Sequence, residues 1–197
     1  MPVITEITAE LLLVSDQFSD TQTPRSPGLH LSDIISDLGR KLGYLETYDN
    51  DDLNVRESRF SLGFIWENFV ATQMRDTTIA YSNGVIFRPP ELTIDGIHMS
   101  PDAFDLAMPG LREYKCTAKS MGREIGSEKF WMWWTQIQAY CHGMGVNEAI
   151  LQVMFLNGNW SDRAGAHQRA WKAVFADHEL LENWTMLMNH RRTMKSG

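Results

Sequence analysis

SPDAFDLAMPGLREYKCT, residues 100–117, carries the strongest structural signal in the sequence. Its second half, LREYKC at residues 111–116, predicts a β-strand, in which successive side chains point to opposite faces. Glu113 and Lys115 are therefore expected side by side on one face. Asp102 comes eleven residues before Glu113, at the start of a segment that can pair with this strand as a hairpin. The hairpin would return the Asp102 carboxylate to the same place.

Two carboxylates and a lysine at a sheet edge suit a hard cation such as Mg²⁺, with the ammonium orienting or deprotonating a water molecule. The competing interpretation is an ordinary ion pair of Glu113 with Lys115 on a solvated face. The choice of the metal-binding aspartate is also open, because Asp95 and Asp105 are alternatives to Asp102. Asp102 is preferred for its shorter hairpin to Glu113 and for the proline that precedes it.

Hydrophobic periodicity and turn residues predict a mixed α/β sheet flanked by helices. The first helix is expected to begin after an N-cap at Ser32 or Asp33 and to bury an apolar face that includes Leu42. Helices are expected over 32–42, 58–74, 128–142 and 177–190, and strands over 78–87, 91–99, 111–116, 149–155 and 168–176.

Two further motifs flank this stretch. Gly63-Phe-Ile-Trp-Glu67 has the form G-x-x-x-E in a predicted helix, and Gln136-Ile-Gln-Ala-Tyr140 has the form Q-x-x-x-Y in the helix after the E-x-K strand. The i, i+4 spacing places Gln136 and Tyr140 on one helical face. In this order the motifs resemble those of the PD-(D/E)xK nuclease superfamily, whose restriction-endonuclease-like core has the order αβββαβ. The particular residues of these motifs are most similar to those of the RecB-like, phage lambda-type (YqaJ-like) recombination exonucleases.

The resemblance implies a Mg²⁺-dependent deoxyribonuclease, in which Mn²⁺ can substitute for Mg²⁺. It would resect linear double-stranded DNA as an exonuclease in the 5′ to 3′ direction, for phage-type recombination or repair. It implies metal ligation by Glu67, Asp102, Glu113 and the carbonyl of Tyr114. Lys115 would act on the attacking water, and Gln136 and Tyr140 would reach the phosphate and the nucleic acid. A structure-specific or restriction-type endonuclease and a non-catalytic DNA-binding protein are the alternatives.

DNA contacts are expected on two segments. The resemblance suggests that Arg25 and Ser32 bind a 5′ phosphate, and the polar loop after the E-x-K strand offers Lys119, Arg123 and Lys129 as a phosphate-binding rim. The rim residues have an equally ordinary interpretation as a solvated loop. His98 is expected to be a hydrogen-bonded structural residue rather than a neighbour of the metal.

Cys116 and Cys141 are the two cysteines, too few for the four-cysteine iron–sulfur cluster of some superfamily members. No iron–sulfur cluster is therefore expected. The expected partners are double-stranded DNA ends, a single-strand annealing protein or recombinase, and further copies of the same chain.

The 197 residues predict one nuclease domain, with an acidic segment 1–55 before a catalytic core 56–160 and a C-terminal strand and helix over 165–197. Taken alone, the net charge of -7 is unfavourable for binding DNA. Residues 1–55 hold ten acidic and three basic side chains, whereas the remainder holds fifteen of each. The catalytic region is therefore neutral. The start of the chain predicts neither a secretory signal nor a membrane span, so a cytoplasmic location is expected, in the host cytoplasm if a phage encodes the protein.

Overall fold

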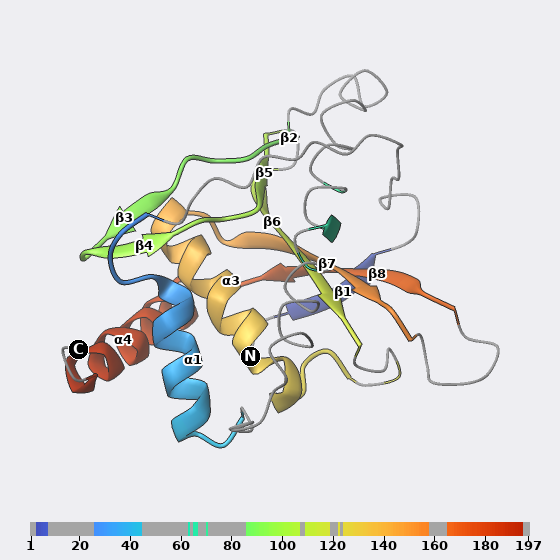
Figure 1. Cartoon of the computed structure of the whole chain (residues 1–197). Helices are drawn as coiled ribbons and strands as arrows, with labels where there is room; N and C mark the ends of the chain where they lie inside the picture. Colours follow the sequence, from blue (N-terminus) through green and yellow to red (C-terminus); the bar gives the residue numbers. More distant parts are fainter. Residues whose placement is uncertain are drawn as a thin grey trace.

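The computed structural model describes residues 3–7, 26–44, 63, 65–66, 70, 86–106, 109–118, 122, 124–157 and 165–194. Within them, six strands form one mixed sheet in the order β1-β8-β7-β6-β5-β2, and β3 and β4 form a separate hairpin (Figure 1). The strands are β1 (Val3–Ile7), β2 (Ile86–Phe87), β3 (Leu92–Ile94), β4 (Ile97–Met99), β5 (Ala103–Asp105), β6 (Gly110–Thr117), β7 (Glu148–Phe155) and β8 (His167–Val174). The helices are α1 (Leu31–Lys41), α3 (Trp131–Met144) and α4 (Asp177–Thr193), and a 3₁₀ turn, η3 (Glu128–Phe130), leads into α3.

The strand directions give the expected α/β core. Residues 63, 65–66 and 70 are helical and precede β2, β5 and β6, which pair antiparallel in that order. Helix α3 then connects β6 to β7, and these two strands are parallel. Parallel neighbours require such a crossover connection, because a tight turn can join only antiparallel strands. The order αβββαβ is thus present, and the predicted mixed sheet flanked by helices is confirmed.

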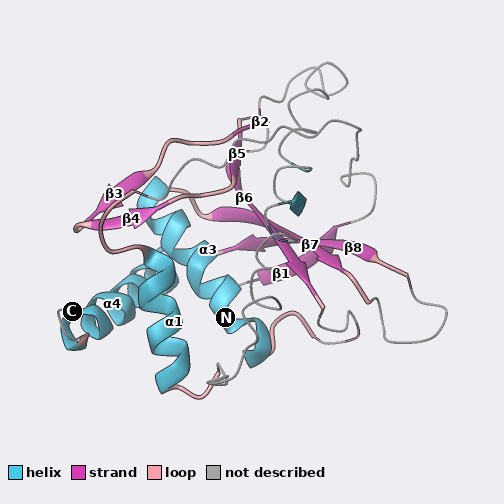
Figure 2. Cartoon of the chain, in the orientation of Figure 1, coloured by secondary structure: helices cyan, strands magenta, loops and turns pink. Residues whose placement is uncertain are grey.

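Helices α1, α3 and α4 lie together on one side of the sheet (Figures 1 and 2). Strands β6, β7 and β8 send alternate side chains into this layer. The core between the helices and the sheet includes Leu111, Leu151, Phe155, Trp171, Ile34, Ile137 and Leu187, all at most 4% exposed. Helix α3 is the central one and is apolar on most of its surface, as a helix covered by both the sheet and other helices must be.

The opposite face of the sheet carries a second, smaller cluster. Trp66 and Val70, from the helical residues before β2, pack with Ala103 and Tyr114. The E-x-K strand is therefore covered on both faces, with Tyr114 on one side and Glu113 on the other. Because both faces of β6 are covered, most of its residues are buried.

Three expectations on the elements differ from the structure. The predicted strand over 91–99 is a tight hairpin, because Asp95 and Gly96 both adopt positive φ, at 51° and 73°. The N-cap of α1 is His30, whose backbone N–H donates to the Asp33 carboxylate. Leu42 lies after the last turn of α1 and is 48% exposed, so it is not part of the core.

Strand β1 covers the outer edge of β8 and was not predicted, since five residues without a turn signal leave no clear pattern. The predicted strand residues before 86 lie outside the described residues. In the part of the chain that the structure describes, no helix is long and apolar enough for a bilayer crossing.

Candidate active site

The E-x-K pair is formed as its alternation predicts. Glu113 and Lys115 both face the helix layer, and Lys115 Nζ donates to Glu113 Oε1 at 2.5 Å. Glu113 is 1% exposed, whereas Lys115 is half-buried. The ion pair is therefore enclosed at its acidic end and reaches toward solvent at its basic end.

Asp102 is the aspartate that reaches this pair. The pairing of Ala103 with Arg112 puts Asp102 opposite Glu113, one position beyond the end of the β5–β6 ladder. Asp102 Oδ2 accepts a hydrogen bond from the Tyr114 backbone N–H at 2.8 Å, and the Asp102 and Glu113 side chains also share a hydrogen bond.

Burial is the largest influence on the Asp102 carboxyl and raises its pKa; the positive charge of Lys115 is the largest opposing influence. Arg88, an exposed residue that follows β2, also opposes the rise through its charge. Arg88 is not among the predicted site residues, because nothing in the linear sequence shows that the end of β2 lies beside Asp102. The positive charges of Lys115 and Arg88 therefore offset only part of the cost of burying the Asp102 carboxylate.

Helix α3 connects the Q-x-x-x-Y motif to the lysine. Gln136 Oε1 accepts from Lys115 Nζ at 3.1 Å, and Gln136 Nε2 donates to the Tyr140 hydroxyl at 2.7 Å. Tyr140 is 4% exposed, so its hydroxyl lies inside the protein. The expectation had both side chains reaching toward nucleic acid; the structure joins them to Lys115 in one hydrogen-bonded chain.

Tyr114 contributes its backbone to this site. Its side chain points to the other face of the sheet, where burial raises the pKa of the phenol far above its usual range. Its N–H is bonded to Asp102, and in a strand the N–H and C=O of one residue project toward the same neighbour. The Tyr114 carbonyl therefore projects toward the Asp102 side, as a ligand beside that carboxylate must.

Cys141 lies in helix α3 and is buried. Burial, with a smaller contribution from the Glu113 charge, raises the pKa of the Cys141 thiol to about 12. A thiol with such a pKa is a poor nucleophile and a poor metal ligand at neutral pH.

The donor set fits a hard divalent cation. Two buried carboxylates in contact, one with a pKa that burial raises, gain charge compensation when a cation binds between them. Mg²⁺ is commonly held by one or two carboxylates and completes its shell with water and substrate phosphate. In the described ranges, no group of three or more His, Cys, Asp or Glu side chains is arranged to hold a metal. Glu67, the predicted third carboxylate, lies outside the described residues, although its neighbour Trp66 packs in the cluster that contains Tyr114.

The two alternative aspartates are placed elsewhere. Asp95, at the turn of the β3–β4 hairpin, accepts from Trp184 Nε1 of α4 at 3.2 Å. Asp105 is buried and holds Arg112 through two hydrogen bonds of 2.6 and 3.1 Å. Neither carboxylate is joined to Glu113, so the structure brings Asp102 alone of the three candidates to the E-x-K pair.

His98 has the structural environment that was expected of it. Its Nδ1 is 3.0 Å from Glu91 Oε1, and its ring packs against the backbone of Gly28. Among the predicted DNA contacts, Ser32 is exposed at the start of α1 and Lys129 is exposed in η3. Arg25, Lys119 and Arg123 lie outside the described residues.

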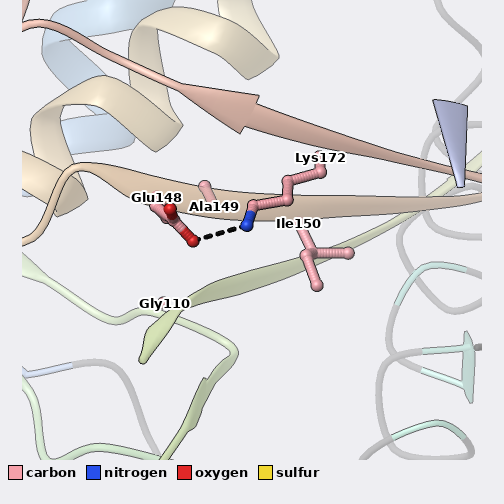
Figure 3. A pocket seen from close by; sticks show the side chains of 5 residues that line it. All are labelled: Gly110, Glu148, Ala149, Ile150 and Lys172. Carbon is pink, nitrogen blue, oxygen red and sulfur yellow. Dashed lines mark ion pairs between the residues drawn. The ribbon is translucent and has the colours of Figure 1, made fainter. Parts of the chain in front are cut away.

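A small pocket of about 20 Å³ lies away from these residues (Figure 3). It is lined by Gly110, Glu148, Ala149, Ile150 and Lys172, and Lys172 Nζ pairs with Glu148 Oε2 at 2.7 Å. Gly110 begins β6, whereas Lys115 lies five residues further along the strand. The pocket has room for about one water molecule and contains none of the candidate site residues.

The sequence matches no protein-family model, and no curated protein matches it. Among solved structures, the chain is similar to an alkaline exonuclease, LHK-Exo, from Laribacter hongkongensis, with 17% identity over 81% of this chain and 77% of that one and a TM-score of 0.46. A second LHK-Exo structure, in complex with dAMP, has 14% identity over 84% of this chain and 86% of that one, with a TM-score of 0.46. A phage-related exonuclease from Haemophilus somnus 129PT has 8% identity over 81% of this chain and 78% of that one, with a TM-score of 0.44. These proteins are exonucleases, the class that the sequence motifs resemble.

Proposed function

We propose that this protein is a metal-dependent deoxyribonuclease that degrades linear double-stranded DNA as an exonuclease. The observation that carries the proposal is the connected set Asp102, Glu113, Lys115, Gln136 and Tyr140, in which two buried carboxylates and one ammonium meet just past the end of the β5–β6 ladder. This set contains the groups that phosphodiester hydrolysis needs: ligands for a cation and a fixed positive charge beside them.

The carboxylates of Asp102 and Glu113 and the carbonyl of Tyr114 would hold Mg²⁺, with Mn²⁺ as a substitute and Glu67 as a further ligand. Such a cation supplies charge neutralisation for the phosphate and a lowered pKa for a water molecule. The ligands come from adjacent strands, so their separation is set by the sheet and not by a mobile loop.

Lys115 is positioned for electrostatic stabilisation. Its ammonium is held at two points, by Glu113 on its own strand and by Gln136 on α3. A cation fixed before the reaction stabilises charge on a phosphate oxygen without reorganising during the step. Lys115 would also orient the attacking water by donating a hydrogen bond to it.

Gln136 and Tyr140 act as positioning residues in this proposal. The amide can donate to the Tyr140 hydroxyl only through its nitrogen, so its oxygen is directed to Lys115. Tyr140 thereby fixes the orientation of Gln136, and Gln136 fixes the ammonium.

The finer substrate proposal draws on the sequence motifs. Digestion from the 5′ end would leave a single strand for an annealing protein or recombinase in phage-type recombination or repair. Arg25 and Ser32 would bind the 5′ phosphate, and Lys119, Arg123 and Lys129 would follow the backbone. Assembly of several copies around the duplex and a cytoplasmic location complete the proposal.

Linear and covalently closed circular duplexes of the same sequence, incubated with Mg²⁺ and with EDTA, test the reaction class. An exonuclease degrades the linear form in Mg²⁺ and spares the circle, whereas cutting of the circle would show an endonuclease. Lys115→Ala should abolish degradation. Lys172→Ala is the matched control, because Lys172 is a lysine of the same sheet that pairs with an exposed glutamate away from the site.

A further inference from the structure

A row of paired residues crosses the sheet from the candidate lysine to an arginine. Lys115 of β6 pairs with Val153 of β7, and Val153 pairs with Arg169 of β8. Directly paired residues project to the same face, so Arg169 and Lys115 both face the helix layer. Two strand spacings separate their backbones, which is about 10 Å.

This face of the three strands is otherwise almost wholly apolar. Its buried positions are Leu111, Ala149, Leu151, Val153, Phe155, Trp171 and Ala173. The charged side chains at the helix-facing positions of β6, β7 and β8 are Glu113, Lys115 and Arg169. Glu113 and Lys115 form an ion pair, so Arg169 gives this face its second cation, in the same row as the first.

The position of Arg169 is supported by an aromatic ring. Its guanidinium carbon lies 5.0 Å from the centroid of the Trp171 ring, and Trp171 is 4% exposed. Trp171 is itself held edge-on by Phe155, with ring centroids 6.2 Å apart. A guanidinium stacked on a rigid ring loses little further freedom when it binds, and its planar fork of donors matches the oxygens of a phosphate.

We propose that Arg169 forms a second phosphate-binding position, which holds a phosphodiester of the DNA strand next to the phosphate at Lys115. The inference rests on the proposed function and adds to it a substrate-binding residue on β8, outside the P-D, E-x-K and Q-x-x-x-Y motifs.

The test is the salt dependence of DNA binding. A labelled linear duplex is titrated, by fluorescence anisotropy, with protein carrying Lys115→Met to prevent turnover, at salt concentrations from about 50 to about 200 mM. Added Arg169→Gln should weaken binding about tenfold and lower the slope of log K against log salt by about 0.9, the value for one phosphate contact. Arg169→Lys keeps the charge and should keep the slope.

Lys172→Gln is the matched control, because Lys172 lies on the same strand three residues away and faces the opposite side of the sheet. It should leave both affinity and slope unchanged. In protein that retains Lys115, Arg169→Gln should raise KM for linear duplex more than it lowers kcat.

If Arg169→Gln lowers the melting temperature but leaves the salt slope equal to that of the Lys172→Gln control, Arg169 only packs on Trp171 and the inference is wrong. A parent protein that neither binds nor degrades duplex DNA would overturn the proposed function itself. The two failures are distinguishable, because the first requires a parent that binds DNA with a measurable slope.

Discussion

Gln136 accepts a hydrogen bond from Lys115 at 3.1 Å, across the contact between α3 and β6. The pair joins two motifs that are 21 residues apart in the sequence. It makes the ammonium part of the folded framework, since both Gln136 and the strand that carries Lys115 are fixed by the core. Several expected outcomes depend on this link and on the carboxylates beside it.

Tyr140→Phe removes the hydroxyl that accepts from Gln136 Nε2. The amide then loses the contact that sets its orientation, and its oxygen is no longer held toward Lys115. We expect kcat for linear duplex to fall about tenfold, equivalent to about 1.4 kcal/mol, with little change in KM. Tyr44→Phe is the control, since Tyr44 lies exposed after α1. An unchanged kcat in Tyr140→Phe would show that the hydroxyl does not position Gln136.

Asp102→Asn tests the cost of burying the carboxylate. Because the pKa of Asp102 is raised in the folded state, the folded protein holds a proton that the unfolded chain releases, and stability falls as the pH rises above the unfolded value. The metal-free Asn variant should therefore melt at a higher temperature than wild type at pH 7. The difference should shrink on acidification toward the usual aspartate pKa, about 3.9.

The same variant should lose the rise in melting temperature that Mg²⁺ gives the wild type, because a neutral amide is a weaker ligand than a carboxylate. Thermal unfolding with and without Mg²⁺ checks both statements. A lower melting temperature for metal-free Asp102→Asn at pH 7 would contradict the unfavourable burial of the charge.

Asp105→Ala should be strongly destabilising. Asp105 and Arg112 form an ion pair in which each side chain is 5% exposed, so removal of the carboxylate leaves a buried, uncompensated guanidinium. The free energy of unfolding should fall by about 3–5 kcal/mol in a urea titration. Glu148→Ala breaks a comparable pair with Lys172, whose side chains are 41% and 42% exposed, and should cost less than about 1 kcal/mol. Equal effects of the two variants would show that burial does not decide the value of these ion pairs.

Local patterns predicted much of the E-x-K strand, because alternation along a strand depends on neighbouring residues alone. Glu113 and Lys115 were placed on one face from LREYKC, and the structure has them there. The i, i+4 spacing likewise put Gln136 and Tyr140 together, although their contacts with Lys115 depend on how α3 packs on β6.

The choice among Asp95, Asp102 and Asp105 needed the pairing of strands. Thr93-Ile-Asp-Gly-Ile-His98 carries the Asp-Gly signal of a two-residue hairpin turn, which would have assigned Asp95 to a turn. Arg169 could not be found from the sequence, because its relation to Lys115 passes through the register of three strands.

The central claim is that Asp102, Glu113 and Lys115 form a metal-dependent active site for DNA hydrolysis. The most direct measurement is the rate at which wild type and Glu113→Gln degrade linear duplex DNA in Mg²⁺ and in EDTA. We expect degradation by the wild type in Mg²⁺, none in EDTA, and none by Glu113→Gln in either. Wild-type protein that leaves the duplex intact in Mg²⁺, or a Glu113→Gln variant that degrades it at the wild-type rate, would contradict the claim.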